Sequence, residues 1–305
     1  MVKNFLSLAD FSGPEILAFL ELADELKKHQ KEGRAHELLK GKTLALIFEK
    51  PSLRTRLTFQ LGMFQLGGFS LLMDMRLGQR GSVPDVARNL ERWVDGIMAR
   101  TFRHEDVEQL AQCASIPVIN ALTDKLHPCQ ILADVQTLRE HKGTDLSSLK
   151  VAFVGDGNNV FHSWANFASR IPLNLTLVCP EGYEGDPQIM ERAAKEAKGQ
   201  IAIVHDPEEG LKEADVVYTD VWTSMGQEQE EAIREKVFAP YQVNAALMQL
   251  AKPDALFMHC LPAQRGHEVT EDVIDGPSSV CFDQAENRLH AQKAVLATLL
   301  RSGNV

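Results

Sequence analysis

Short apolar runs alternate with longer amphipathic stretches along most of this chain, and that alternation limits the folds open to it. A first series of runs reads TLALIF (43–48), FSLLMD (69–74), DGIMAR (95–100) and IPVIN (116–120). Helical patterns lie between these runs, near 53–66, 84–93 and 104–114. Strands that alternate with helices predict a parallel sheet with helices on both of its faces.

A second series follows a long helical pattern at 127–143, whose Pro128 and Gly143 suit a helix start and a helix end. Its apolar runs span 149–156, 173–180, 200–206, 214–220, 255–260 and 278–283. We therefore predict an α/β fold of two domains, each a parallel β-sheet flanked by helices. The predicted domains are 1–143 and 144–283, and the closing stretch 284–301 is predicted to be an amphipathic helix that packs on one of them.

Composition narrows the class of protein. The 305 residues suffice for two domains with separate cores. The net charge of -10 argues against a general nucleic-acid binder. No apolar run approaches the roughly 20 residues that span a bilayer, and the N-terminal stretch lacks the apolar core of a signal peptide. Five scattered cysteines without a C-x-x-C pair favour a reduced, cytoplasmic protein over a disulfide scaffold or a zinc site.

Polar clusters follow several of the predicted strands. In open parallel sheets, ligands bind beyond the carboxyl ends of the strands, in the loops that lead into helices. The clusters at such positions are Ser52–Arg56, Arg100, Gly155–Asn159, Asp220–Met225 and His259–Pro262. This pattern predicts an active site in one interdomain cleft.

In the first series, the stretch SLRTR combines a helix N-cap residue, Ser52, with Arg54 and Thr55. Guanidinium groups, hydroxyls and a helix N-terminus suit a phosphate. A solvated helix start with surface arginines has the same sequence pattern and is the alternative. Arg56 lies on another part of the helix and is the better candidate for a structural ion pair. Arg100 ends a strand, where it is either a ligand or a surface arginine.

The stretch HPCQ places His127 and Gln130 on the first turn of a helix. Both side chains can donate hydrogen bonds to a carbonyl oxygen as negative charge develops on it. A purely structural histidine remains the alternative.

In the second series, FVGDGNNVFHSW has glycines at 155 and 157, but Val160 stands at the third glycine position of a dinucleotide fingerprint. Asn158 and Asn159 suit a carboxylate or an ammonium group, or the glycines serve only a tight turn. The stretch DVWTSMGQE offers Asp220 for a substrate ammonium, unless it is a plain surface loop.

The stretch MHCLPA places Cys260 at the end of a strand, as either a small apolar residue or a nucleophile. Neighbouring residues on an extended chain point to opposite sides, so His259 is poorly placed to act as its base.

The stretches SLRTR, MARTF, HPCQ, DGNN, DVWTSMGQE, HCLPA and DQAENRLH occur here in the order and at the spacings of the ornithine carbamoyltransferase family, which the chain resembles from about residue 40 to its end. The resemblance implies a carbamoyl phosphate domain, an ornithine domain and a last helix that packs back on the first domain. It implies a carbamoyl phosphate site made of Ser52, Leu53, Arg54, Thr55, Arg100, His127, Gln130, Cys260, Leu261 and Arg288. The implied ornithine residues are Asn159, Asp220, Ser224 and Met225, and the implied catalytic residues are Arg54, Arg100, His127 and Cys260.

The resemblance also implies a homotrimer or higher homo-oligomer that needs no metal and no organic cofactor. Two positions depart from the family pattern. Leu53 stands where threonine is usual, which does no harm if that position acts through its backbone N–H but lowers affinity if the hydroxyl is needed. The family commonly supplies a glutamine from a neighbouring subunit; here Arg76 lies nearest that position and Gln79 follows three residues later, and both are candidates to reach the neighbour's site.

The implied reaction is carbamoyl transfer from carbamoyl phosphate to the side-chain amine of L-ornithine, giving L-citrulline and phosphate. The rivals within the family are aspartate, putrescine and acylated-ornithine carbamoyltransferases. Rivals from other classes are a dinucleotide-dependent oxidoreductase, which Val160 disfavours, and a non-catalytic binding protein, which the nearly complete motif set disfavours.

Overall fold

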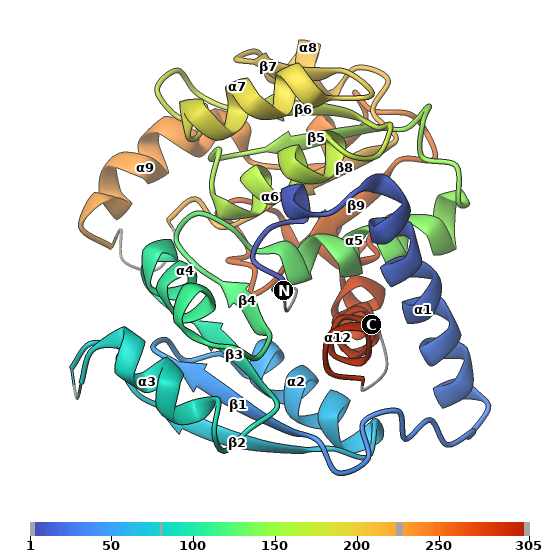
Figure 1. The fold of residues 1–305 in the computed structure, drawn as a ribbon. Coiled ribbons are helices and arrows are strands. Elements are labelled where there is room, and N and C mark those ends of the chain that lie inside the picture. Colours follow the sequence, from blue (N-terminus) through green and yellow to red (C-terminus); the bar gives the residue numbers. More distant parts are fainter. Residues whose placement is uncertain (1–3, 80, 224–227, 302–305) are drawn as a thin grey trace. The chain divides into compact units, whose positions relative to one another are not determined.

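The computed structural model describes residues 4–79, 81–223 and 228–301. The chain divides into two compact units, which are described separately (Figure 1). The first unit comprises Met1–Gln136 and Glu286–Val305, and the second comprises Thr137–Ala285. The chain passes from one unit to the other within helix α5 (Pro128–Lys142) and returns within helix α12 (Cys281–Leu300).

The first unit contains a four-stranded sheet in the order β2-β1-β3-β4, and every neighbouring pair is parallel. Its strands are β1 (Thr43–Phe48), β2 (Phe69–Asp74), β3 (Gly96–Arg100) and β4 (Val118–Leu122). Strands β1 and β3 are almost fully buried, because both of their faces are covered.

Helices lie on both faces of this sheet (Figure 1). On one face, α3 (Val83–Leu90) and α4 (His104–Cys113) build an apolar core with alternate residues of β1 and β3. On the other face, α2 (Leu53–Gln65) packs against α12, where Gly62 lies under Lys293 and Leu296. Helix α1 (Gly13–Lys31) contacts α12 through a hydrogen bond from Lys27 to Asn287.

The second unit contains a five-stranded parallel sheet in the order β7-β6-β5-β8-β9. Its strands are β5 (Lys150–Val154), β6 (Asn174–Val178), β7 (Ile201–Val204), β8 (Val216–Thr219) and β9 (Leu256–His259). Its further helices are α6 (Asn159–Ala168), α7 (Pro187–Glu196), α8 (Pro207–Leu211), α9 (Glu231–Phe238), α10 (Ala245–Met248) and α11 (Glu271–Ile274).

In each sheet, successive strands are first added toward one edge and then toward the other. Such a switch point opens a crevice at the carboxyl ends of the two strands that flank it. In the first unit the reversal lies between β1 and β3, whose ends carry Ser52 and Arg100. In the second unit it lies between β5 and β8, whose ends carry the Asp156–Asn159 turn and Asp220. Topology alone therefore brings the predicted polar clusters together in pairs.

The predicted α/β class with two parallel sheets is confirmed, and nine of the ten predicted strands are present within a few residues of their expected bounds. The tenth, at 278–283, is wrong. Ser279 makes only an isolated bridge to Phe257, and Cys281 already begins α12. A short apolar run fits a buried helix start as well as a strand, so the sequence pattern could not separate them.

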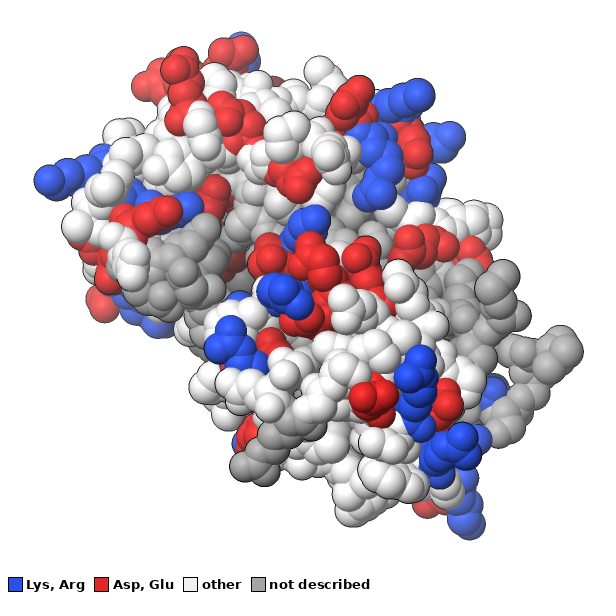
Figure 2. Space-filling view, turned by 60° about the vertical axis from the view of Figure 1, so that its left-hand side comes forward, with Lys and Arg blue, Asp and Glu red and all other residues white. Residues whose placement is uncertain are grey.

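The surface carries mixed charge. Acidic and basic side chains lie interspersed on the face drawn in Figure 2, without a single broad basic area. Among the described residues, every helix is too short or too polar to cross a membrane.

Candidate active site

In the first unit, a cluster of predicted site residues begins where β1 ends. Ser52 is the N-cap of α2, and its hydroxyl accepts a hydrogen bond from the backbone N–H of Thr55 at 3.3 Å. The remaining N–H groups of this first turn have no partner within the helix, and the helix dipole adds positive potential there. The turn is therefore suited to an anion.

Leu53 is the first residue of α2, and its side chain is 71% exposed. The residue thus occupies a position whose backbone N–H is available, while its side chain extends into solvent. A role through the backbone N–H is compatible with this geometry, and no hydroxyl is present at this position.

A buried hydrogen-bond network supports this turn from the side of α12. Arg288 donates to Thr55 Oγ1 at 3.1 Å and to Gln130 Oε1 at 2.6 Å. Gln130 in turn donates from Nε2 to Asp134 Oδ1 at 2.7 Å. All four side chains are almost fully buried. The network fixes the Arg288 guanidinium beside the N-terminus of α2 and links three of the predicted site residues.

His127 lies among three arginines. The side chain is buried, and its pKa lies well below the usual value, chiefly because burial disfavours the imidazolium. The positive charges of Arg288, Arg100 and Arg54 lower the pKa of His127 further. The structure therefore brings four predicted residues together and keeps the imidazole neutral at physiological pH.

Two further arginines near this turn, Arg56 and Arg76, have other partners than His127. Arg56 is half exposed, and its Nη1 lies 3.9 Å from Asp74 Oδ2, so it forms the ion pair that the sequence favoured for it. The Arg76 guanidinium lies over the Phe102 ring, with 5.4 Å between Cζ and the ring centroid. Both residues line a pocket of about 760 Å³ together with Phe48, Glu49, Lys50, Pro51, Ser52, Leu53, Leu57, Asp74 and Met75.

In the second unit, another cluster of predicted site residues joins the ends of β5 and β8. Asn158 is the N-cap of α6 and accepts from the N–H groups of Val160 and Phe161, while its Nδ2 donates to Asp220 Oδ2 at 2.8 Å. Asn159 follows as the first residue of α6. The structure thus brings the predicted Asn159 and Asp220 to one end of the sheet.

The two glycines of this turn have structural reasons to be glycine. Gly155 has φ +136°, which side chains strongly disfavour. A Cβ added at Gly157 would lie 2.5 Å from the backbone nitrogen of Gly185. The tight-turn interpretation therefore explains both residues without a dinucleotide.

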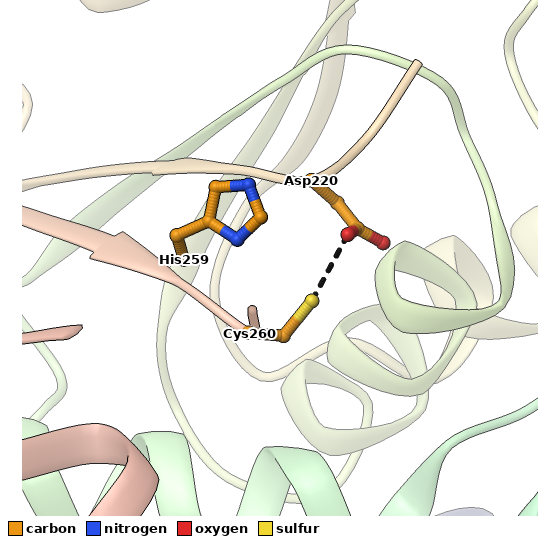
Figure 3. Close-up of side chains that lie close together, drawn as sticks. All are labelled: Asp220, His259 and Cys260. Atoms are coloured by element: carbon orange, nitrogen blue, oxygen red, sulfur yellow. Dashed lines mark hydrogen bonds between the residues drawn. The ribbon is translucent and has the colours of Figure 1, made fainter. Parts of the chain in front are cut away.

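Cys260 and Asp220 point toward each other (Figure 3). The thiol donates to Asp220 Oδ1 at 3.0 Å. His259 does not serve this thiol, as the sequence predicted, because both of its ring nitrogens have other partners. Nδ1 accepts from the Leu261 N–H at 2.9 Å, so Nε2 carries the proton and donates to the buried Glu268 at 2.9 Å.

Asp220, His259 and Cys260 offer three metal-ligand atoms within 4.8 Å of one another. Because both His259 nitrogens are engaged in hydrogen bonds, the donor set fits a hydrogen-bonded turn better than a metal centre. Leu261 is held in this turn by its N–H bond to His259. The predicted Ser224 and Met225 lie outside the described residues.

Sequence reasoning missed several groups that support the site. Asp134 and Glu268 are buried carboxylates that orient Gln130 and His259. Arg234 is a buried arginine that reaches Asp156 from α9. None of them lies in a polar cluster at a strand end, so the rule that found the other residues gave no signal for these.

Comparisons with known proteins identify the family of both units. Residues 3–140 match the family model described as aspartate/ornithine carbamoyltransferase, carbamoyl-P binding domain. Residues 147–299 match the model described as aspartate/ornithine carbamoyltransferase, Asp/Orn binding domain.

Individual relatives match over nearly the whole chain. An ornithine carbamoyltransferase from Thermococcus kodakarensis is 53% identical over 304 residues, which cover 98% of this chain and 96% of that protein. An anabolic ornithine carbamoyltransferase from Pyrococcus furiosus is 52% identical over the same shares of the two chains. The solved structure of ornithine carbamoyltransferase from Pyrococcus furiosus superposes with a TM-score of 0.96 at 51% identity and covers 99% of this chain and 98% of that one. The chain therefore belongs to the aspartate/ornithine carbamoyltransferase family, among its ornithine carbamoyltransferases.

Proposed function

We propose that the protein transfers the carbamoyl group of carbamoyl phosphate to the side-chain amine of L-ornithine, giving L-citrulline and phosphate. The observation that carries this proposal is the convergence of Arg54, Arg100 and Arg288 on the neutral His127, beside the N-terminus of α2. Three guanidinium groups and a helix N-terminus suit a phosphate dianion. The family match supports the same substrate for this unit.

The carbamoyl carbonyl is polarised by neutral donors. A neutral imidazole donates a hydrogen bond without carrying a charge of its own, so His127 strengthens its bond as the oxyanion develops. Gln130 has a second N–H beyond the one that it gives to Asp134, and we assign that N–H to the same oxygen. Arg54 and Arg100 stabilise the charge that builds on the leaving phosphate.

The acceptor amine attacks in its neutral form, although an alkyl ammonium has a pKa of about 10.4. We assign the α-ammonium of ornithine to Asp220 and Asn159, together with Ser224 and Met225. We place the reacting amine beside Cys260 and Leu261. The amine nitrogen forms the new C–N bond, and the bond between the carbonyl carbon and the bridging oxygen breaks. Phosphate leaves with that oxygen and takes the amine proton. Most of the acceleration then comes from positioning the two substrates.

The charge of the second half-site favours ornithine over the acceptors of sister enzymes. Asp156 is largely buried and paired with Arg234, so Asp220 is the carboxylate that we assign to the substrate, and it suits an ammonium group better than the second carboxylate of aspartate. Putrescine has no α-carboxylate or α-ammonium for Asn159 and Asp220 to recognise. Acylated ornithine carries no charge on its α-nitrogen.

We propose a homotrimer or higher homo-oligomer on the strength of an exposed apolar stripe on α2. Leu53, Leu57, Leu61 and Phe64 recur every three or four residues, and all four side chains are exposed. Contiguous exposed apolar surface of this kind marks protein contacts in soluble proteins.

We also propose a cytoplasmic enzyme of arginine biosynthesis. All five cysteines are free thiols, which suits a reducing compartment. The similar enzyme of Pyrococcus furiosus is described as anabolic.

The substitution Arg54→Ala tests the phosphate assignment. Removing one donor to developing charge is expected to lower kcat/KM for carbamoyl phosphate by about a hundredfold or more, with the urea unfolding midpoint unchanged. Arg88→Ala is a matched control, because Arg88 is an exposed arginine paired with Asp85. Normal turnover by Arg54→Ala would contradict the assignment.

A further inference from the structure

We propose that Arg234 is a positioning residue for ornithine, because it ties together the two turns that carry Asn159 and Asp220. The inference rests on the proposed function and adds a residue to its second half-site. Arg234 lies on α9, and its side chain is only 7% exposed. It does not contact the predicted ligand groups itself, so its effect on them is indirect.

The Arg234 guanidinium bridges the ends of two strands. Its Nη1 donates to Asp156 Oδ2 at 2.8 Å and to the backbone carbonyl of Trp222 at 3.0 Å. Asp156 follows β5 and lies three residues before Asn159, and Trp222 follows β8 and lies two residues after Asp220. One side chain therefore sets the spacing between the two turns of the half-site.

A second bond crosses the same gap. Asn158 Nδ2 donates to Asp220 Oδ2 at 2.8 Å. If the Arg234 bridge is lost, this bond from an amide to a carboxylate remains, as does the bond from Thr219 Oγ1 to the Val154 carbonyl at 2.7 Å, but neither joins a cation to an anion.

Arg234 also balances the negative charge around the ammonium site. Burial raises the pKa of Asp156, and the nearby charge of Asp220 raises it further, whereas the Arg234 guanidinium lowers it. Arg234 additionally donates from Nε to Glu230 Oε2 at 2.9 Å. Without the guanidinium, Asp156 would either take up a proton or compete with Asp220 for the ammonium group.

Aromatic packing fixes the arginine from its other side. The guanidinium lies over the Tyr183 ring, with Cζ 5.1 Å from the ring centroid. Tyr183 packs edge-on against Phe238, which stacks with Trp222. The carbonyl of Tyr183 accepts from the Gly157 N–H at 2.9 Å, so the same cluster also supports the asparagine turn.

Steady-state kinetics of Arg234→Gln test this role. We expect KM for ornithine to rise about tenfold or more, while KM for carbamoyl phosphate stays within twofold of its original value. Arg234→Lys keeps the positive charge but loses the two-pronged guanidinium, so its KM for ornithine should lie between those of the original enzyme and Arg234→Gln. Arg170→Gln is the control, since it breaks the Arg170–Glu196 ion pair elsewhere in the second unit and should leave both constants unchanged.

The double variant Arg234→Gln with Asp156→Asn separates the loss of the bridge from the effect of the unpaired Asp156 carboxylate that Arg234→Gln leaves. Removing both charges avoids an unpaired buried carboxylate, so its KM for ornithine should lie below that of Arg234→Gln alone. A lower kcat with an unchanged KM for ornithine, or equal rises in both KM values, would overturn the proposal. If the unmodified enzyme makes no citrulline from ornithine, the proposed function fails and this inference fails with it.

Discussion

His127 shows how a single residue acquires its chemistry from its surroundings. Its burial and its three arginine neighbours both disfavour the imidazolium, so they act in the same direction on its pKa. The result is a histidine that donates a hydrogen bond without adding a positive charge. In the proposed mechanism, this neutral donor polarises the carbonyl oxygen without adding a further positive charge beside three guanidinium groups.

The state of His127 predicts a pH dependence of stability. Because its pKa in the folded protein lies well below the usual value, the unfolded chain binds the extra proton as pH falls through about 6.5, and the native state does not. The free energy of unfolding should therefore decrease as pH falls below about 6.5. The variant His127→Gln should lose part of this decrease in urea titrations at pH 5 and 7. An imidazole NMR signal of His127 that titrates near pH 6.5 would contradict the account.

Gly157 yields a second prediction at this scale. A Cβ at this position would meet the Gly185 backbone at 2.5 Å, so one of the two turns must shift in Gly157→Ala. We expect a loss of about 1–3 kcal/mol in unfolding free energy and a higher KM for ornithine. Gly143→Ala provides a comparison, because a Cβ there meets nothing within 4 Å and only backbone strain at φ +91° remains. Unchanged ornithine kinetics in Gly157→Ala would show that the turn tolerates the shift.

The site residues that could be predicted from the sequence are those that follow predicted strands. Ser52, Arg100, Asn159 and Asp220 all lie at or just beyond strand ends, where the rule for parallel sheets predicts ligand-binding residues. Asp134 and Arg234 act on the site from within helices, and only the tertiary fold brings them near it. A helix surface offers too many polar residues for the sequence alone to single out the buried ones.

At the scale of elements, the apolar runs predicted most strands because both faces of a parallel sheet are buried. TLALIF matches the buried strand β1 residue for residue, and FSLLMD matches β2, although β2 is an edge strand of exposed and half-buried residues. The run at 278–283 failed because its apolar residues serve the start of α12. Apolar runs of this length indicate burial more reliably than they indicate the type of element.

Helix α12 is held to its neighbours by a buried lysine, which predicts a further pH effect. Lys293 donates to Gln30 Oε1 and Gln65 Oε1 at 2.8 and 3.0 Å, and burial lowers the pKa of Lys293 to about 8. The unfolded chain keeps this proton up to a pKa of about 10.4. The free energy of unfolding contributed by this group should therefore rise between pH 8 and pH 9.5.

The variant Lys293→Met checks this effect. It should be less stable at every pH, because two amide oxygens lose a donor, but it should lack the rise that the original chain shows. Lys125→Met, which replaces a half-exposed lysine, should keep the rise. Parallel pH profiles for the original chain and Lys293→Met would contradict the assignment.

At the scale of the whole molecule, the apolar stripe of α2 predicts self-association. Phe64 is 77% exposed, and Phe69 and Leu71 on the edge strand β2 are exposed as well. The double variant Leu61→Glu with Phe64→Glu should sediment as a smaller species than the original chain in analytical ultracentrifugation. Leu17→Glu on α1 is the control for an added charge at an exposed leucine. A monomeric original chain, or an assembly that both glutamates leave intact, would contradict the proposed oligomer.

Acceptor choice tests the central claim most directly. Purified protein would be incubated with carbamoyl phosphate and, in parallel, with L-ornithine, putrescine, N-acetylornithine or L-aspartate, and each carbamoylated product would be quantified. The account predicts citrulline from ornithine at a kcat/KM far above that of the other three acceptors. Preference for another acceptor would contradict the assignment of Asp220 and Asn159, and no product with any of them would contradict the proposed reaction itself.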